Sequence, residues 1–169
     1  APLGIYGRSK ADGETSVLAS LPSALILRTG WVYAAQGGNF LCTMLRLMRE
    51  RPEVRVVADQ IGTPTHADSL ARAIWALALG GHSGTLHYSD SGTASWYDFA
   101  VAIQEEALAM GLLESAVPIV PIRTEDYPTP ARRPSYSVLD KTETFDLLGG
   151  PSAHWREELR CALRQLRIG

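Results

Sequence analysis

The sequence has little cysteine, and it lacks a long apolar run. Its two cysteines, Cys42 and Cys161, stand in apolar helical patterns, and their spacing fits neither a disulfide framework nor a zinc site. We therefore expect both to be buried free thiols in a reducing compartment. The longest apolar runs, such as AIWALALG, are far too short to span a bilayer. These absences predict a cytoplasmic protein that has no membrane segment.

A strong charge of either sign is also missing. The 169 residues include 16 Lys and Arg against 18 Asp and Glu, which gives a formal net charge of -2. This balance predicts no general attraction to nucleic acid or to an anionic membrane, so any basic site must be local. A hydrophobic share of 46% is ordinary for a folded globular protein. The length suits one domain with a sizeable core.

The glycine-rich phosphate turn of dinucleotide-binding folds is absent as well. Such folds open with a strand, a G-x-G-x-x-G-like turn and a helix, whereas GGHSG here follows a helix. The chain also starts without an initiator methionine or a lead-in loop before its first helical pattern. We expect that an upstream segment is missing.

Strand-like and helix-like segments alternate along the rest of the chain. Helices are expected at residues 7–20, 39–51, 67–79, 95–110, 140–148 and 152–167, and strands at 24–29, 54–58, 85–89 and in VPIVPI. Ser95 and Asp98 form a capping-box pattern at one helix start. This alternation predicts an α/β fold with a largely parallel sheet.

One tyrosine and one lysine have the spacing of a catalytic pair. Tyr6 and Lys10 are four residues apart, which places them on one helix face. An ammonium ion near a phenol favours ionisation of the phenol, and a phenol tuned in this way can donate a proton to a carbonyl that is being reduced. The chain has fourteen arginines and only two lysines, so a lysine at this position is notable. Spacing alone leaves catalysis and coincidence about equally supported.

Four stretches, in order, resemble a known family. YGRSKADGE is similar to the catalytic helix of the extended short-chain dehydrogenases/reductases, in particular of the dTDP-4-dehydrorhamnose reductases. ILRTGWVYAAQGGNF resembles that family's strand and loop below the nicotinamide, and VVADQIGTPTHADSLA its second strand and substrate-side loop. YPTPARRPSYSVLD resembles its C-terminal proline-arginine loop. The resemblance covers essentially the whole chain.

The resemblance implies a fold and its division. Residues 1–58 would be the C-terminal part of a Rossmann-like, doubly wound parallel sheet with the catalytic helix. Residues 59–169 would be mainly a smaller α/β substrate-binding domain, interleaved with the sheet. The family's N-terminal dinucleotide-binding half is absent from this sequence, and so is the serine or threonine that orients the carbonyl. We therefore expect the isolated chain to be inactive and to bind NADPH weakly.

The resemblance also implies a reaction. NADPH or NADH would reduce the 4-keto group of dTDP-4-dehydro-6-deoxy-L-mannose and give dTDP-L-rhamnose. Tyr6 would be the proton donor and Lys10 its partner, and both would contact the cofactor together with Thr29 and Gly30. The sequence does not discriminate NADPH from NADH. The full-length parent would be a homodimer.

Three residues are implied for the substrate, and each has a structural alternative. Trp31 would lie beside the sugar, with core packing as the alternative. Asn39 would bind the substrate or cap a helix, or do both. Arg133 would meet the diphosphate through its planar guanidinium. Gln60 and Thr65 suggest the substrate side of a loop, but a turn role fits them at least as well.

A metal is not predicted, and two other functions stay open. Asp68 matches a position where some family members have a magnesium-binding glutamate, but a helix N-terminal cap explains it equally well. The four histidines have no ligand spacing and are expected to be structural or on the surface. The alternatives are a nucleotide-sugar epimerase or dehydratase with the same pair, and a non-catalytic relative that binds a partner protein. The regulatory subunit of methionine adenosyltransferase is an example of the latter.

Overall fold

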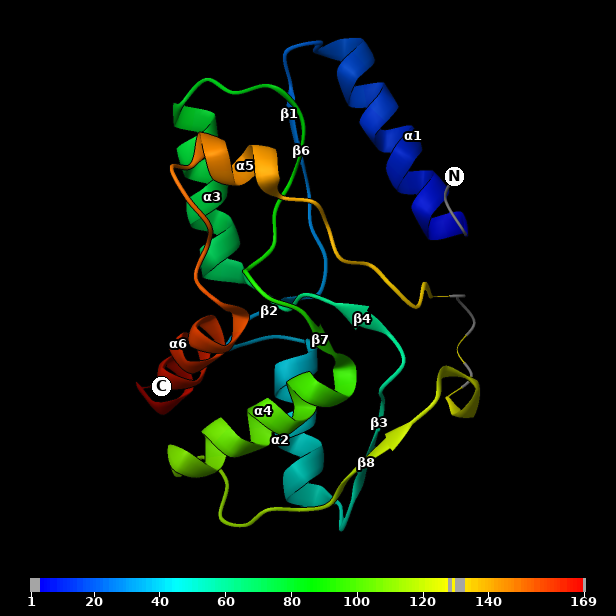
Figure 1. Cartoon of the computed structure of the whole chain (residues 1–169), viewed down its shortest axis with the longest axis vertical. Coiled ribbons are helices and arrows are strands. Elements are labelled where there is room, and N and C mark those ends of the chain that lie inside the picture. Colours follow the sequence, from blue (N-terminus) through cyan, green and yellow to red (C-terminus); the bar gives the residue numbers. More distant parts are fainter. Residues whose placement is uncertain (1–3, 128, 130–132, 169) are drawn as a thin grey trace.

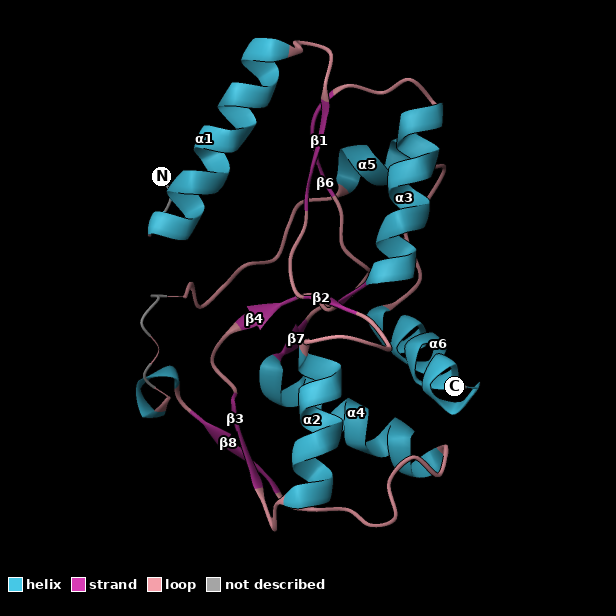
Figure 2. Cartoon of the chain, turned by 180° about the vertical axis from the view of Figure 1, so that it is seen from behind, coloured by secondary structure: helices cyan, strands magenta, loops and turns pink. Residues whose placement is uncertain are grey.

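Short parallel strand pairs with accompanying helices organise the fold (Figures 1 and 2). The computed structural model describes residues 4–127, 129 and 133–168. The first pair is β1 (Leu25–Arg28) with β6 (Gly84–His87), which run in parallel. The helices of this part are α1 (Ile5–Ser20), α3 (Ala67–Leu79) and α5 (Thr142–Leu147).

A second part surrounds β3 (Val54–Val57) and β8 (Ile119–Ile122), which are also parallel. Its helices are α2 (Phe40–Glu50), α4 (Trp96–Ala109) and α6 (Trp155–Ile168). These helices supply the centre of the core with five large, fully buried side chains: Leu41, Phe99, Ile103, Leu159 and Leu163. Burial of such apolar side chains is the main source of stability in this part.

Four two-residue strands lie between the two parts (Figure 1). β2 (Val32–Tyr33) pairs in parallel with β5 (Thr65–His66), and β4 (Ile61–Gly62) pairs antiparallel with β7 (Ala94–Ser95). A 3-10 turn, η1 (Thr124–Asp126), follows β8. The chain passes from one part to the other through these short strands, so loops from both parts meet there.

The predicted α/β class with parallel strand pairing is confirmed. The helix at 67–79 has the predicted bounds, and Ser95 and Asp98 form the predicted capping box on α4. The division at residue 58 remains a proposal. In the described structure α2 and β3 share one core with α4 and α6, as interleaving of the two ranges would require.

The prediction that both cysteines are buried is wrong. Both are free thiols, but Cys42 is half-buried and Cys161 is exposed. In sequence, Cys161 stands midway between Leu159 and Leu163 of α6, which are both buried. On the helix, it lies on the side opposite to them. Its apolar neighbours in sequence therefore belong to a face that it does not share.

Every helix in the described ranges is too short or too polar to cross a bilayer.

Candidate active site

Tyr6 and Lys10 lie on one face of α1, near its amino end. The Nζ atom of Lys10 is 5.7 Å from the centroid of the Tyr6 ring, as the four-residue spacing predicts. Both side chains are exposed, and the relative accessibility of Tyr6 is 76%. The structure therefore brings the predicted pair together and leaves it open to solvent.

An ion pair connects α1 to β1. Arg28, the last residue of β1, donates from Nε and Nη2 to the two carboxylate oxygens of Glu14, at 2.8 and 2.5 Å. The hydrogen bonds from Arg28 lower the pKa of the Glu14 carboxyl. Figure 1 shows the amino end of α1 and the carboxyl end of β1 on the same side of the molecule. Tyr6 and Lys10 are thus on the side on which the chain leaves β1.

Thr65 holds the loop that follows β1. Its Oγ1 donates to the carbonyl oxygen of Gly30 at 2.8 Å, and its backbone N–H donates to the carbonyl oxygen of Trp31 at 3.1 Å. Thr65 is fully buried, so its hydroxyl serves the loop. Thr29 is exposed and Gly30 half-buried at the carboxyl end of β1. Ligands of open parallel sheets bind outside this end of the strands.

Trp31 packs face to face against another indole. Its backbone is left-handed, with φ at 51°, which is uncommon for a bulky residue. Its ring is stacked on Trp96, with 3.5 Å between the centroids and 9° between the planes. Trp96 also contacts Phe40, whose ring centroid is 4.7 Å away. We call Trp31, Trp96 and Phe40 the aromatic row. Trp31 is half-buried and stacks on Trp96 without belonging to the buried core, and its contact with substrate remains a proposal.

Asn39 caps α2 and braces the loop before it. Its Oδ1 accepts from the backbone N–H of Cys42 at 3.2 Å. Its Nδ2 donates to the carbonyl oxygens of Ala34 and Gln36 at 3.0 Å and of Gly37 at 3.3 Å. The capping role is thus confirmed. The side-chain amide is engaged within the chain, and a direct substrate contact remains a proposal.

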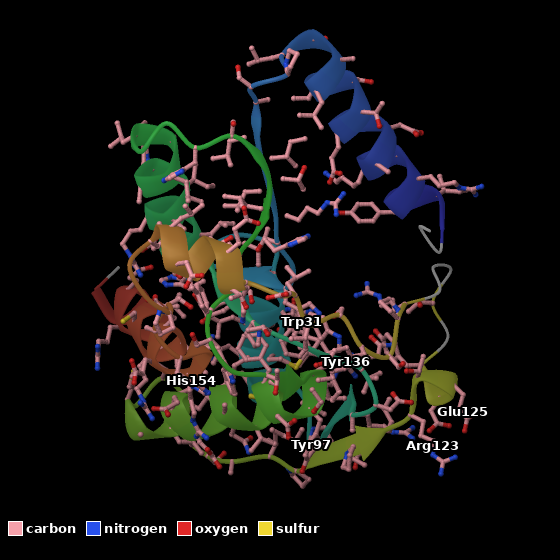
Figure 3. All side chains as sticks on the ribbon, turned by 45° about the horizontal axis from the view of Figure 1, so that its top comes forward. Trp31, Tyr97, Arg123, Glu125, Tyr136 and His154 are labelled. Carbon is pink, nitrogen blue, oxygen red and sulfur yellow. The ribbon has the colours of Figure 1, made fainter. Side chains whose placement is uncertain are left out.

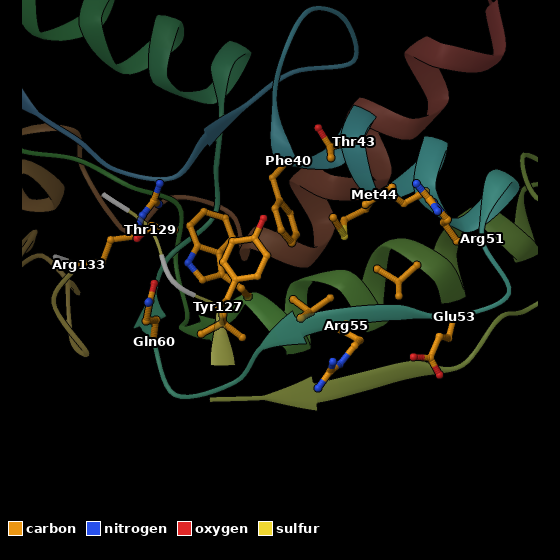
Figure 4. Close-up of a pocket in the computed structure, with 15 residues that line it drawn as sticks. Phe40, Thr43, Met44, Arg51, Glu53, Arg55, Gln60, Tyr127, Thr129 and Arg133 are labelled. Atoms are coloured by element: carbon orange, nitrogen blue, oxygen red, sulfur yellow. The ribbon is translucent and has the colours of Figure 1, made fainter. Parts of the chain in front are cut away.

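A cavity of about 560 Å³ opens beside α2 and β3 (Figure 4). Its apolar lining comes from α2, β3 and α4: Phe40, Met44, Leu47, Val54, Val56 and Trp96. Three cations also line it: Arg51, Arg55 and Arg133. Within the part of the chain that the structure describes, none of these guanidinium groups forms an ion pair. In Figure 4, Arg133 and Gln60 lie at one end and Arg51 and Glu53 at the other.

The η1 turn beside the cavity is anchored by Asp59. The carboxylate accepts from the backbone N–H of Thr124 at 2.9 and 3.1 Å and from its Oγ1 at 2.7 Å. Buried Gln60 donates from Nε2 to the same Thr124 Oγ1 at 3.0 Å. The hydrogen bonds from Thr124 lower the pKa of Asp59. The backbone N–H of Tyr127, which lines the cavity, donates to the carbonyl oxygen of Thr124 at 3.1 Å. Gln60 therefore has the structural role that the sequence left open.

The sequence did not reveal the anchor at Asp59 or the role of Trp96. Asp59 stands in the quoted DQIGTPT stretch, but its partner Thr124 is 65 positions away. A single sequence carries no signal for such a contact.

A buried polar network lies behind β5. Asp90 accepts from the backbone N–H of His66 at 2.8 Å and from the hydroxyl of Ser69. Glu158 lies 2.9 Å from His66 Nδ1 and accepts from Arg72 at 2.6 Å. Burial raises the pKa of Asp90 to about 6. His66 is thus a structural residue, as predicted.

Asp68 lies in the first turn of α3, whose N-cap position belongs to His66. Its Oδ2 accepts from Gln165 at 2.6 Å. A carboxylate at this position is stabilised by the helix dipole. Among residues 4–127, 129 and 133–168, no group of three or more His, Cys, Asp or Glu side chains is placed to hold a metal ion.

The RmlD substrate binding domain family matches residues 1–168. The chain belongs to this family. It is 41% identical over 165 residues to the dTDP-4-dehydrorhamnose reductase of Aggregatibacter actinomycetemcomitans, covering 94% of this chain and 56% of that protein. The chain thus spans little more than half the length of this relative.

Two solved structures agree in fold with this member of the RmlD substrate binding domain family. The dTDP-4-dehydrorhamnose reductase of Clostridium acetobutylicum has a TM-score of 0.90 at 38% identity, covering 99% of this chain and 57% of that one. The Bacillus anthracis reductase, solved in complex with NADP, has a TM-score of 0.89 at 37% identity, covering 98% and 57%. Both support the predicted resemblance and the likeness to the C-terminal part of a reductase.

Proposed function

We propose that this chain is the substrate-binding portion of a dTDP-4-dehydrorhamnose reductase. The observation that carries the proposal is the 560 Å³ cavity with its three arginines, which form no ion pair with any residue that the structure describes. Its aromatic and aliphatic side chains suit a nucleobase, and its guanidinium groups suit a diphosphate. The aromatic row leads from the cavity to the loop after β1. A dTDP-sugar bound in the cavity would therefore extend its sugar toward that loop.

Tyr6 and Lys10 would act on the sugar carbonyl. A reduced nicotinamide supplies hydride to the carbonyl carbon when it is bound. The carbonyl oxygen then needs a proton, which the Tyr6 hydroxyl would donate. The Lys10 ammonium would stabilise the phenolate that remains. Thr29 and Gly30, at the carboxyl end of β1, would line the nicotinamide side, and Trp31, Asn39 and Arg133 the substrate side.

The chain's own residues fit only part of the cofactor. Lys10 offers an exposed ammonium to ribose hydroxyls, but the sequence contains no glycine-rich phosphate turn. We propose that the isolated chain neither binds NADPH or NADH tightly nor turns over. Titration calorimetry of the chain with each nucleotide tests this, since micromolar binding of either would contradict it. The full-length parent would be a cytoplasmic homodimer, which sedimentation of that protein tests.

Binding of dTDP to the chain tests the cavity. We expect micromolar affinity in titration calorimetry. Arg133→Ala should weaken binding roughly tenfold to a hundredfold, because a charge-assisted hydrogen bond is lost. Arg123→Ala is the matched control, because Arg123 is exposed, pairs with Glu125 at 3.3 Å (Figure 3) and is not among the residues that line the cavity. Absence of dTDP binding, or equal weakening by both variants, would contradict the proposal.

A further inference from the structure

The indole of Trp31 is enclosed on both faces. Trp96 is stacked on one face. A Cβ atom added to Gly62 would lie 2.5 Å from Trp31 Cε2, 2.7 Å from Nε1 and 2.8 Å from Cζ2. Cε2 lies in the notch between Nε1 and Cζ2 at the ring edge, so an approach within the ring plane would bring those two atoms closer than Cε2. Because Cε2 is the closest of the three, the Cβ would approach over the ring face. All three closest atoms belong to Trp31 and none to Trp96, so Gly62 covers the opposite face.

We propose that Gly62 is a positioning residue for the substrate. It gives the Trp31 indole room to lie flat between β4 and Trp96, and it thereby fixes the wall that the sugar meets. The inference rests on the proposed function for its ligand, while the placement of Trp31 is independent of any ligand. It also assigns a role to the glycine of DQIGTPT, which the catalytic pair and the cavity do not use.

The backbone around Trp31 supports a fixed indole. Thr65 binds the carbonyl oxygens of Gly30 and Trp31, and the left-handed φ of Trp31 directs its ring toward β4. With both faces covered, the indole offers only an edge to a sugar. The position of that edge depends on how closely β4 approaches, and only glycine allows the observed contact. Gly62 has no left-handed φ of its own, so alanine is compatible with its backbone.

Gly62→Ala should displace the indole of Trp31. Neither Gly62 nor Trp31 is among the residues that line the cavity, although Trp31 is stacked on Trp96, which does line it. The four tryptophans give four indole N–H signals in an NMR spectrum, which single Trp→Phe variants assign. Stacked rings shift each other's signals, so Gly62→Ala should move those of Trp31 and Trp96. Gly80→Ala is the control, because its added Cβ would also meet a side chain at close range, His82 at 2.8 Å, but at the end of α3 and not at Trp31. Unchanged Trp31 and Trp96 signals would overturn the placement.

The functional part is tested by comparing dTDP with dTDP-L-rhamnose in titration calorimetry. Gly62→Ala should weaken binding of the nucleotide sugar about tenfold, because misplacement of about an ångström is costly, and should leave dTDP binding unchanged. In a Trp31→Ala background the same substitution should have no effect, since the clash is gone. Equal weakening of both ligands, or an effect that persists without Trp31, would overturn the proposal. If dTDP does not bind the unmodified chain, the proposed function fails, and the NMR comparison still decides the placement of Trp31.

Discussion

At the residue scale, the single side chain of Asn39 supplies hydrogen-bond partners both to the start of α2 and to the loop before it. Its amide accepts one backbone hydrogen bond at the start of α2 and donates to three carbonyl oxygens. The sequence placed Asn39 at a helix start from the apolar pattern that follows it. It could not show the carbonyls of Ala34, Gln36 and Gly37, because the path of that loop depends on tertiary contacts.

We predict that Asn39→Ala lowers the free energy of unfolding by about 1 to 2 kcal/mol, as expected for loss of a cap. Asn39→Asp keeps the acceptor for the Cys42 N–H and loses the donors. Its free energy of unfolding should therefore lie between those of the unmodified chain and of Asn39→Ala. Urea unfolding of the three proteins measures this order. An Asn39→Ala variant as stable as the unmodified chain would contradict the capping role.

Asp90 should make the free energy of unfolding of the chain depend on pH. Its carboxyl has a pKa raised from 3.8 to about 6, chiefly by burial and also by the nearby Glu158 carboxylate, while the hydrogen bonds from Ser69 and His66 act in the opposite direction. The folded state thus holds this proton more tightly than the unfolded chain. The resulting stabilisation is complete below pH 3.8 and is lost as the pH rises through about 6.

Asp90→Asn isolates this contribution, because asparagine does not titrate. The unmodified chain should lose stability relative to the variant as the pH rises between these two values, and the difference should then level off. Urea unfolding of both proteins across this range measures the difference. A difference that stays constant, or that grows in favour of the unmodified chain, would contradict the assigned pKa.

At the scale of elements, the long helices were predictable and the short strands were not. The capping box of Ser95 and Asp98 and the apolar spacing of α3 marked helices from local sequence alone. Two-residue strands such as β4 and β5 carry no periodic pattern. Their pairing follows from contacts such as that of Thr65 with Gly30, which only the folded chain reveals.

α1 should be the least protected long helix in the chain as given. None of its described residues is buried, whereas α4 buries Phe99, Ala100 and Ile103 among others. A helix without buried contacts opens locally at low free energy. Hydrogen exchange followed by mass spectrometry should show faster exchange over Ile5–Ser20 than over Trp96–Ala109. Equal protection of the two helices would contradict this prediction.

At the scale of the whole molecule, the structure shows how the catalytic pair and the cavity are arranged relative to each other, which the sequence did not show. The pair of Tyr6 and Lys10 lies on the side on which the chain leaves β1, and the cavity lies beside β3. The aromatic row runs between the loop after β1 and the cavity. The quoted motifs predicted Tyr6, Trp31 and Arg133, but the row depends on Trp96, which no motif indicated.

In the function proposed above, the cavity beside α2 and β3 holds the nucleotide of a dTDP-sugar. Chemical-shift mapping of dTDP on the 169-residue chain tests this most directly. If the nucleotide binds in the cavity, the largest shifts will fall on Phe40, Val56 and the indole of Trp96, with little change in α1 or α3. Shifts confined to residues outside the cavity, or no shifts at saturating dTDP, would contradict it.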